Sequence, residues 1–444
     1  MPADPGEPRL RRAFVAAFRQ RLAGHALIYI GATAINSAIP FILLPFLTRW
    51  LGAADFGIVG VYVALVNVLG VLVGLSTHGL VSVVYYRDGP EAMPPHVGAA
   101  LGVVATMASA MMALVWLFRG FVARESGIDE AWLWTIVAAA AGQFVVFVVL
   151  AAFQTRQQPF RYGAMQISYA LLLFALSIVL IGEADMGWRG RLLGQATAAT
   201  IAAALGLVWL SRTGAISWSM RRWPMGAAFA FGLPLIPHAL GAVAMSSVDR
   251  LALGSGVGPA AVGRYYVAVQ LASVLVVVAT ALNQAWLPWL YERLARNDDA
   301  ARRTVVKATY GVFALIALAG AGLALVAPWL VPLIAGPGFE AAVGILRLLG
   351  PASALSAMYL FVAGYLFYEK RTGVLSGVTV TVAVIQIALS FALVRSGGTH
   401  GVATATLVSM GLYFAATWAA AQWVHPMPWL AALTGRRTME PRPG

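Results

Sequence analysis

The feature that most constrains this chain is a succession of apolar runs, each about twenty residues long, separated by short polar or Gly- and Pro-containing connections. A helix of about twenty apolar residues spans the hydrocarbon core of a bilayer, which is about 30 Å thick. Within that layer every backbone N–H and C=O group needs an internal hydrogen bond, so only helices and closed barrels cross it. The runs have the length of a membrane-spanning helix, so we expect helices and not the strands of a barrel. The sequence therefore predicts an all-α, polytopic membrane protein.

About twelve spans can be placed, and no connection between them is long enough for a soluble domain. They lie near residues 22–47, 57–83, 97–118, 131–153, 163–183, 192–211, 229–253, 263–290, 305–334, 341–368, 373–395 and 401–424. A basic connection divides them into six and six. The prediction is two six-helix lobes, with an N-terminal segment 1–21, an N-lobe 22–211, a linker 212–228, a C-lobe 229–424 and a tail 425–444.

Composition excludes several classes of protein. The 444 residues are 60% apolar and only 11% charged, unlike a soluble domain. The net charge of +13 is dispersed over short connections with no aromatic-interleaved basic patch, which argues against nucleic acid as a partner. There is no cysteine, so disulfides and thiolate chemistry are excluded. Phosphate-loop, metalloprotease and serine-hydrolase motifs are absent, and the sequence predicts neither an enzyme nor a cofactor.

The charge distribution also predicts an orientation. Most of the 30 Lys and Arg residues fall on the connections that share a side with both termini, which places the linker 212–228 and both termini in the cytoplasm. In segment 1–21 the apolar residues Leu10, Phe14 and Phe18 recur every four residues among several arginines. This pattern indicates an amphipathic helix on the anionic inner leaflet, although a simple topogenic charge cluster explains it equally well.

The two halves contain a weak repeat. The first hairpin reads "TRWLGAADFGIVGVY" (Thr48 to Tyr62), and "DRLALGSGVGPAAVGRYY" (Asp249 to Tyr266) joins the seventh and eighth spans. Each of the two leading helices carries a pair of prolines, namely Pro40 and Pro45, and Pro234 and Pro237. Proline bends a helix, and proline-interrupted spans in corresponding positions point to a transport site. These two helices are predicted to line a central cavity.

Charged residues inside spans are the next candidates for function, because a charge near the bilayer centre costs at least about 2.5–3.5 kcal/mol. Asp249 is the acidic residue that falls well inside a span, and its partner is expected on another span because adjacent helical residues do not face each other. The arginines predicted to face a cavity are Arg49, Arg250, Arg264 and Arg347. Guanidinium groups bind phosphate bidentately, so this excess of arginine favours an anionic substrate. Snorkelling to the headgroups is the alternative.

Uncharged polar residues inside the spans offer hydrogen bonds to sugars. They are Asn36, Asn67, His78, Gln143, Gln166, Gln195, His238, Gln270, Asn283, Gln284 and Gln386. Bonding between structural helices explains most of them equally well. Asn36 and His238 stand out because they lie on the two proline-bearing helices.

The stretch "LLPFLTRWLGAADFGIVGVY", supported by "SSVDRLALGSGVGPAAVGRYYVA", is similar to the polysaccharide transporter family of Wzx-like O-antigen and exopolysaccharide flippases. That family belongs to the MOP superfamily, with the MATE drug exporters and the lipid II flippase MurJ. The resemblance implies two lobes around a cavity that moves a glycan on a polyprenyl diphosphate across the bacterial inner membrane by alternating access. It implies membrane lipids and glycan polymerase or chain-length machinery as partners. It also implies substrate contacts from Arg49, Arg250 and Arg347.

Two other functions remain open on the sequence. A MATE-like exporter normally uses membrane-embedded acids to couple transport to Na⁺ or H⁺ and to bind cations. Asp249 is a single acid of this kind and gives that function little support. A membrane glycan polymerase or ligase is the less favoured alternative, because the longest outer connection, Arg119 to Glu130, is short for a catalytic loop.

Overall fold

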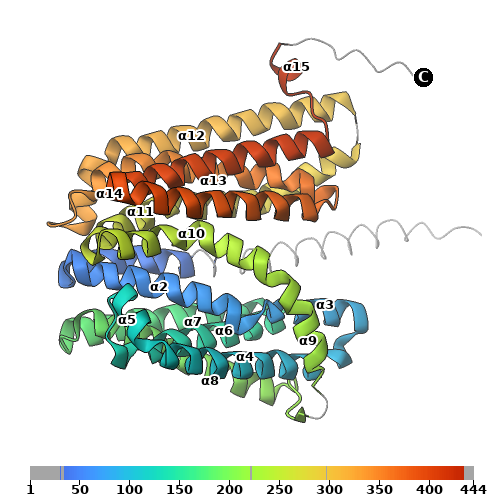
Figure 1. Cartoon of the computed structure of the whole chain (residues 1–444). Coiled ribbons are helices and arrows are strands. Elements are labelled where there is room, and N and C mark those ends of the chain that lie inside the picture. Colours follow the sequence, from blue (N-terminus) through green and yellow to red (C-terminus); the bar gives the residue numbers. More distant parts are fainter. Residues whose placement is uncertain (1–30, 32–34, 221–222, 297, 435–444) are drawn as a thin grey trace, which may run out of the picture.

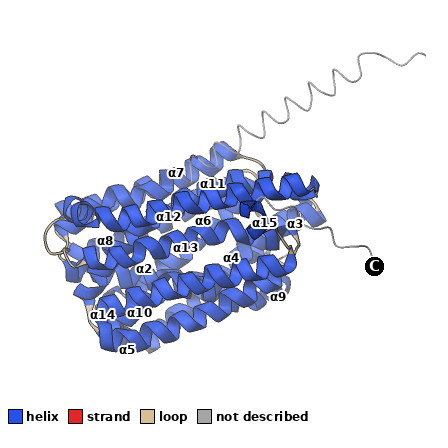
Figure 2. Ribbon diagram, turned by 90° about the horizontal axis from the view of Figure 1, so that it is seen from above, coloured by secondary structure: helices blue, strands red, loops and turns tan. Residues whose placement is uncertain are grey.

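The computed structural model describes residues 31, 35–220, 223–296 and 298–434, and this part of the chain contains helices and connecting loops but no strand (Figures 1 and 2). The predicted amphipathic segment 1–21, the beginning of the first span and residues 435–444 of the tail lie outside the described residues. The all-α prediction is confirmed.

The N-lobe begins with a helix over residues 35–50. Its long helices are α2 (Ala53–Gly74), α4 (Met93–Leu117), α6 (Trp134–Thr155), α7 (Pro159–Ile178) and α8 (Gly187–Arg212). Shorter elements connect or extend them: α3 (Thr77–Asp88), η1 (Pro90–Ala92), α5 (Arg119–Ser126), η2 (Glu130–Trp132) and the π-helix η3 (Val179–Glu183).

The C-lobe begins with a span in three pieces, α9 (Met225–Gly232), the 3-10 turn η5 (Leu233–Leu235) and α10 (Ile236–Gly256). It continues with α11 (Pro259–Arg296), α12 (Asp299–Ala335), α13 (Ala342–Tyr368) and α14 (Thr372–Val424), and a short α15 (Trp429–Thr434) follows. In Figure 1 the two lobes lie one above the other, with α2 and α10 between them.

Helix α14 is a hairpin of two spans rather than one helix. The Thr379 hydroxyl lies 3.2 Å from the Tyr413 hydroxyl, although a continuous helix would separate these residues by about 50 Å. The reversal occurs at Gly398, whose φ of 53° and ψ of −131° are not helical. The predicted spans 373–395 and 401–424 are therefore both present within it.

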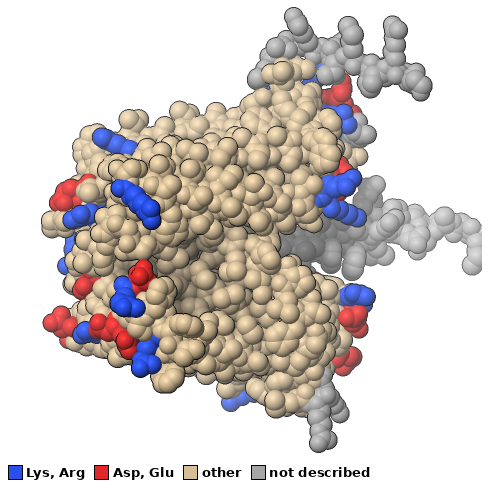
Figure 3. Space-filling view, viewed as in Figure 1, with Lys and Arg blue, Asp and Glu red and all other residues tan. Residues whose placement is uncertain are grey.

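The described residues contain ten helices long and apolar enough to cross a membrane, counting the α14 hairpin as one. Large apolar side chains cover their outer faces; on α12, for example, Leu318, Leu325 and Trp329 are 71%, 71% and 73% exposed. Charged side chains gather toward the two ends of the molecule on the face shown in Figure 3. This distribution places lipid around the middle of the helices, as expected for a multi-pass membrane protein.

Two spans predicted as single helices are broken. The predicted span 57–83 is interrupted at Leu75 and Ser76, whose φ values of 47° and 53° are left-handed. The predicted span 229–253 is interrupted at η5. The breaks touch, because a Cβ added to Gly232 would lie 2.3 Å from the Leu75 carbonyl oxygen.

The four prolines singled out by the sequence lie in different settings. Pro234 is in η5 and Pro237 is in the first turn of α10, where the seventh span changes direction. Pro40 and Pro45 lie in the helix over residues 35–50, which is assigned without a break. The break in the N-lobe therefore falls in the second span and contains no proline.

Candidate substrate cavity between the lobes

A cavity of about 470 Å³ lies between the lobes, and helices from both contribute to its wall. On α10 its lining residues recur at helical spacing from His238 to Ser246, and on α2 they run from Val66 to Val71. The polar members of the wall are Asn67, Ser76, His78, Gln143, His238 and Ser246. Among the described residues that line it, none is Asp, Glu, Lys or Arg.

These polar groups are available to a ligand. Asn67, Gln143 and His238 make no side-chain hydrogen bond within the described part of the chain, and neither does the buried Nδ1 of His78. The His78 ring packs edge-on against Phe144 at 5.3 Å between ring centroids. A buried or half-buried polar group without a partner is costly, so this wall is suited to a substrate that supplies many hydroxyl groups.

The cavity is closed at the end where α2 and α11 begin. A Cβ added to Gly57 would lie 1.7 Å from the Pro259 carbonyl oxygen, which shows that the two backbones touch. The Phe56 ring stacks on Tyr266 at 5.3 Å and meets Phe339 edge-on at 6.0 Å. Phe56, Tyr266 and Phe339 thus form an apolar cluster that connects the two lobes and closes the cavity, and we call this cluster the plug. Further along the molecule, Figure 3 shows a groove between the two lobes on the face in view.

Arg49 connects the two lobes by hydrogen bonds at this closed end. Its guanidinium donates to the Pro45 carbonyl at 3.3 Å and to the Leu333 carbonyl, on α12, at 3.4 Å. In this conformation Arg49 therefore contacts the backbone of the partner lobe and is not part of the cavity wall.

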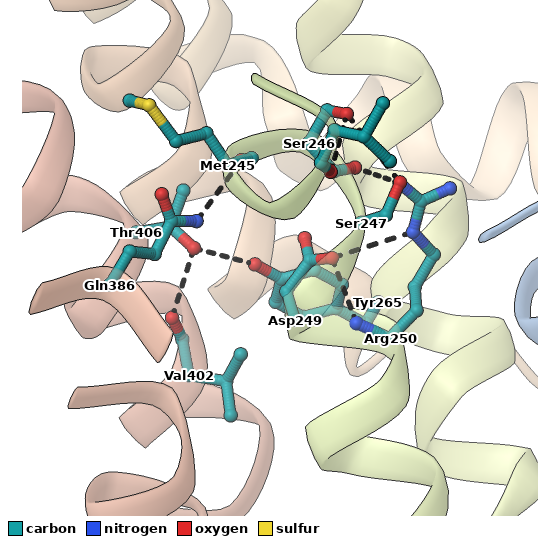
Figure 4. A network of polar contacts seen from close by, with 10 residues as sticks. Met245, Ser246, Ser247, Asp249, Arg250, Tyr265, Gln386, Val402 and Thr406 are labelled. Carbon is teal, nitrogen blue, oxygen red and sulfur yellow. Dashed lines mark hydrogen bonds and ion pairs between the residues drawn. The ribbon is translucent and has the colours of Figure 1, made fainter. Parts of the chain in front are cut away.

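Asp249 and Arg250 form a buried polar network near the cavity (Figure 4). Both residues are 4% exposed, and Arg250 Nε lies 3.4 Å from Asp249 Oδ1. Arg250 also donates to the Ser246 carbonyl and lies 5.2 Å from the centre of the Tyr266 ring. The Tyr265 hydroxyl, beside Asp249, lies 3.0 Å from that of Thr406 on α14.

The expectation that Asp249 pairs with a base on another span is wrong. The Asp249 carboxylate accepts a hydrogen bond from the Arg250 backbone N–H at 2.8 Å and lies beside the Arg250 side chain. The Arg250 side chain is long enough to fold back along its own helix, toward the Ser246 carbonyl. Its guanidinium therefore reaches the Asp249 carboxylate, although the two side chains leave the helix in different directions.

Arg191, near the start of α8, is a half-buried cation that the sequence interpretation missed. Its Nη1 donates to the Ser177 hydroxyl at 2.8 Å, while its buried Nε has no partner in the described residues. The guanidinium is within electrostatic reach of the hydroxyls of Tyr62, Tyr169 and Tyr266. The predicted sixth span began at residue 192 and left Arg191 outside; α8 begins at Gly187 and includes it.

The remaining predicted residues lie away from the cavity. Arg264 donates to the Gly338 carbonyl at 3.3 Å, in the connection between α12 and α13. Backbone hydrogen bonds from Glu340 and Gly338 hold the pKa of the Glu340 carboxyl in that connection below its usual value. Arg347 is exposed on α13, without an ion pair among the described residues, and Asn36 is partly exposed on the first helix. Of the residues singled out on the two proline-bearing helices, His238 lines the cavity, and Asn67, His78 and Gln143 from the wider set of polar span residues line it too.

A family model described as "Polysaccharide biosynthesis protein" matches residues 22–294. A protein of the Lsg locus of Haemophilus influenzae is 22% identical over 380 residues, covering 83% of this chain and 90% of that protein. A second Haemophilus influenzae relative, named only as a membrane protein, is 24% identical over 371 residues, with coverage of 81% and 87%.

Among solved structures, the fold is similar to the lipid II flippase MurJ in an inward closed conformation, with a TM-score of 0.71, 10% identity and coverage of 92% of this chain and 90% of that one. It is also similar to an inward-facing MATE family transporter of the MOP superfamily, with a TM-score of 0.67, 14% identity and coverage of 88% and 97%. Since the family model spans more than half of the sequence and the fold agrees with it, this chain belongs to the polysaccharide biosynthesis protein family.

Proposed function

We propose that this protein is a flippase that moves a lipid-linked oligosaccharide or polysaccharide precursor, carried on a polyprenyl diphosphate, across the bacterial inner membrane. The observation that carries the proposal is the cavity between the lobes, whose described wall presents unpartnered neutral donors and acceptors and no charged side chain. Sugars offer many hydroxyls at low charge density, so amide, imidazole and hydroxyl groups suit them.

Alternating access provides the movement in this proposal. With both termini in the cytoplasm, the plug of Phe56, Tyr266 and Phe339 lies at the outer end, and the cavity faces inward. A rocking of the lobes that separates α2 from α11 would expose the same cavity to the outer leaflet.

Export of cationic drugs is the nearest competing function, and the cavity disfavours it. A cation in a membrane-embedded site needs a carboxylate or a dense set of carbonyl oxygens. The part of the cavity wall that the structure describes contains no acid, and the charge of Asp249 is balanced by Arg250 outside that wall.

Reconstitution in liposomes tests the proposal. A fluorescent polyprenyl-diphosphate oligosaccharide is incorporated in both leaflets, and a membrane-impermeant reagent reports how fast the inner pool becomes accessible. We expect the wild-type protein to accelerate this exchange and Gln143→Leu, which removes an amide from the cavity wall, to slow it at least about ten-fold. Gln154→Leu, at the exposed end of the same helix, is the matched control.

Two results would overturn the proposal. The first is transport of a cationic dye by the wild-type protein, while the lipid-linked oligosaccharide exchanges between leaflets no faster than in empty liposomes. The other is equal exchange by Gln143→Leu and Gln154→Leu.

A further inference from the structure

Helix α6 exposes a single apolar ring in the middle of an otherwise covered stretch. Between Thr135 and Phe153, all of which the structure describes, Phe147 is the one exposed residue, at 42%, and it lines the cavity between the lobes. An aromatic ring left uncovered inside a closely packed lobe lacks the apolar contacts that its neighbours make. The exposure of Phe147 therefore marks a surface that a ligand can cover.

Two other rings of the cavity wall hold the Phe147 ring in place. It meets Phe144 edge-on at 6.1 Å between ring centroids, and its centroid lies 6.2 Å from that of His78. Phe144 itself is 5% exposed and fills the space beside Gly74 on α2, where an added Cβ would lie 1.8 Å from the ring. Phe144, Phe147 and His78 thus form a fixed group of rings, which we call the aromatic wall.

Hydrogen-bonding groups lie beside the aromatic wall. Gln143 is one helical turn, about 5.4 Å, from Phe147 and also lines the cavity. Its amide makes no side-chain hydrogen bond within the described part of the chain, and the buried Nδ1 of His78 has no partner there either. The side of the cavity formed by α10 has small residues between its polar ends, namely Ala239, Ala242 and Val243. These small side chains leave room for a ring-sized group next to the aromatic wall.

An apolar ring beside amide and imidazole groups has the chemistry to bind one sugar ring. A pyranose has C–H bonds on its faces and hydroxyl groups at its rim. The C–H bonds carry a small positive charge and the face of an aromatic ring carries a negative one, so the two attract each other. An amide both donates and accepts hydrogen bonds, as a hydroxyl group does. A lipid chain would cover Phe147 equally well but would leave Gln143 and His78 without partners.

The same wall disfavours a charged sugar. Among the described residues that line the cavity, none is Lys or Arg, and Arg250, one turn past Ser246 on α10, is already paired with Asp249. Residues 22–30 and 32–34, the part of the first span that lies outside the described residues, contain neither Lys nor Arg in their sequence. A carboxylate taken out of water needs a cation or several donors. An acidic sugar is therefore bound less well in this cavity than its uncharged counterpart.

We propose that the aromatic wall and Gln143 form a subsite for one uncharged sugar ring of the glycan, with the ring stacked on Phe147 and its hydroxyl groups bonded to Gln143 and His78. This inference rests on the proposed function and deepens it, since it names uncharged sugars as the class that the cavity selects. All four residues belong to the N-lobe, so this lobe recognises the glycan while the small residues of α10 provide space for it.

Two lipids that differ in one group test the selection of uncharged sugars. Both are polyprenyl diphosphates with the same fluorescent label, and one carries a hexose where the other carries the corresponding hexuronate. They are compared in the liposome exchange assay at pH 8, where free imidazole is uncharged. We expect the wild type to exchange the hexose lipid at least about ten-fold faster, the usual scale of one unsatisfied charged group.

A cation added to the cavity wall should weaken this preference. Asn67 lines the cavity on α2, and we expect Asn67→Lys to lower the hexose-to-hexuronate rate ratio at least about ten-fold relative to the neutral Asn67→Gln. Equal rates for the two lipids in the wild type, or equal ratios in the two Asn67 variants, would overturn the selection of uncharged sugars. A wild type that exchanges neither lipid faster than empty liposomes would instead overturn the proposed function.

Variants of Phe147 test the stacking. Phe147→Leu keeps an apolar side chain but removes the ring, so we expect it to slow exchange of the hexose lipid about three- to ten-fold, on the scale of one aromatic contact. Phe147→Tyr keeps the ring and should slow exchange less. Phe160→Leu is the matched control, because Phe160 is 76% exposed on α7 and is not among the described residues that line the cavity. The Tm of each purified variant verifies that it is folded at the assay temperature. Equal exchange by Phe147→Leu and Phe160→Leu, or equal exchange by Phe147→Leu and Phe147→Tyr, would overturn the stacking on Phe147.

Discussion

At the scale of single residues, the two arginines at the start of α8 show how much depends on the direction of one side chain. Arg189 and Arg191 are two positions apart, which turns their side chains by about 200° around the helix. Arg189 reaches Asp129 at the surface, half exposed, whereas Arg191 donates to the hydroxyl of the buried Ser177. One forms a surface ion pair of small energetic value, and the other forms a hydrogen bond to a neighbouring helix.

Glycine at position 57 permits the closed end of the cavity. Gly57→Ala would place a methyl group 1.7 Å from the Pro259 carbonyl oxygen, so α2 and α11 must separate. Overpacking of this kind typically costs about 1–3 kcal/mol. We expect a lower Tm of the purified protein and greater labelling of cysteine probes placed at the closed end.

The comparison for this prediction is Gly70→Ala on the same helix, because a Cβ there meets no atom within 4 Å. The interpretation of the close contact between α2 and α11 fails if the two variants have the same Tm and labelling.

At the scale of elements, the features that position the site are interruptions of helices. The left-handed pair Leu75 and Ser76 ends α2, and η5 ends α9, so the second and seventh spans change direction beside each other. The residues that follow the two breaks, His78 on α3 and His238 on α10, line the cavity. A broken helix in each lobe thus brings polar side chains to the cavity wall.

The hairpin within α14 depends on one backbone conformation. Gly398 has a positive φ of 53° with a ψ of −131°, which residues with a Cβ rarely adopt, while its neighbour Gly397 does not have a positive φ. Neither glycine has an atom within 4 Å of an added Cβ. We expect Gly398→Ala to destabilise the protein by about 1–3 kcal/mol and Gly397→Ala to change it little.

Thermal unfolding of the two variants in the same detergent checks this difference. An added methyl group has free space at both Gly397 and Gly398, so the two variants differ only in backbone conformation. A similar decrease in Tm for both would show that the backbone conformation at Gly398 does not determine the turn.

At the scale of the whole molecule, the contact between the lobes is tight at one end and a cavity separates them further along. Transport by alternating access requires the tight end to open in each cycle. The chain contains no cysteine, so a single introduced pair can test this directly.

Gly60→Cys with Tyr266→Cys would link α2 to α11. A Cβ on Gly60 lies 3.3 Å from the Tyr266 Cβ, close to the separation of about 3.5–4.5 Å in disulfides. We expect rapid crosslinking in the resting protein, loss of lipid exchange on oxidation and recovery on reduction, relative to the reduced variant. Gly241→Cys with Ala383→Cys, where the added Cβ lies 3.7 Å from Ala383 Cβ within the C-lobe, should crosslink without stopping exchange. Undiminished exchange by the oxidised Gly60 and Tyr266 pair would contradict opening at this end.

Much of the architecture follows from local properties of the sequence. The lengths of the apolar runs predict the spans because bilayer thickness and the hydrogen-bonding needs of the backbone act on each segment separately. The motif around Thr48 to Tyr62 was sufficient to indicate the family. The list of polar span residues also contained four that share the cavity wall, Asn67, His78, Gln143 and His238.

Which of those residues would meet was decided only by the tertiary structure. Whether a side chain faces lipid, a neighbouring helix or the cavity depends on the rotation of each helix and on contacts between lobes that are distant in sequence. The same reason explains why Arg49 connects the lobes, why Arg250 pairs with its neighbour Asp249, and why Arg191 donates to Ser177. Hydropathy determines that a helix enters the membrane, and packing determines what its polar residues touch there.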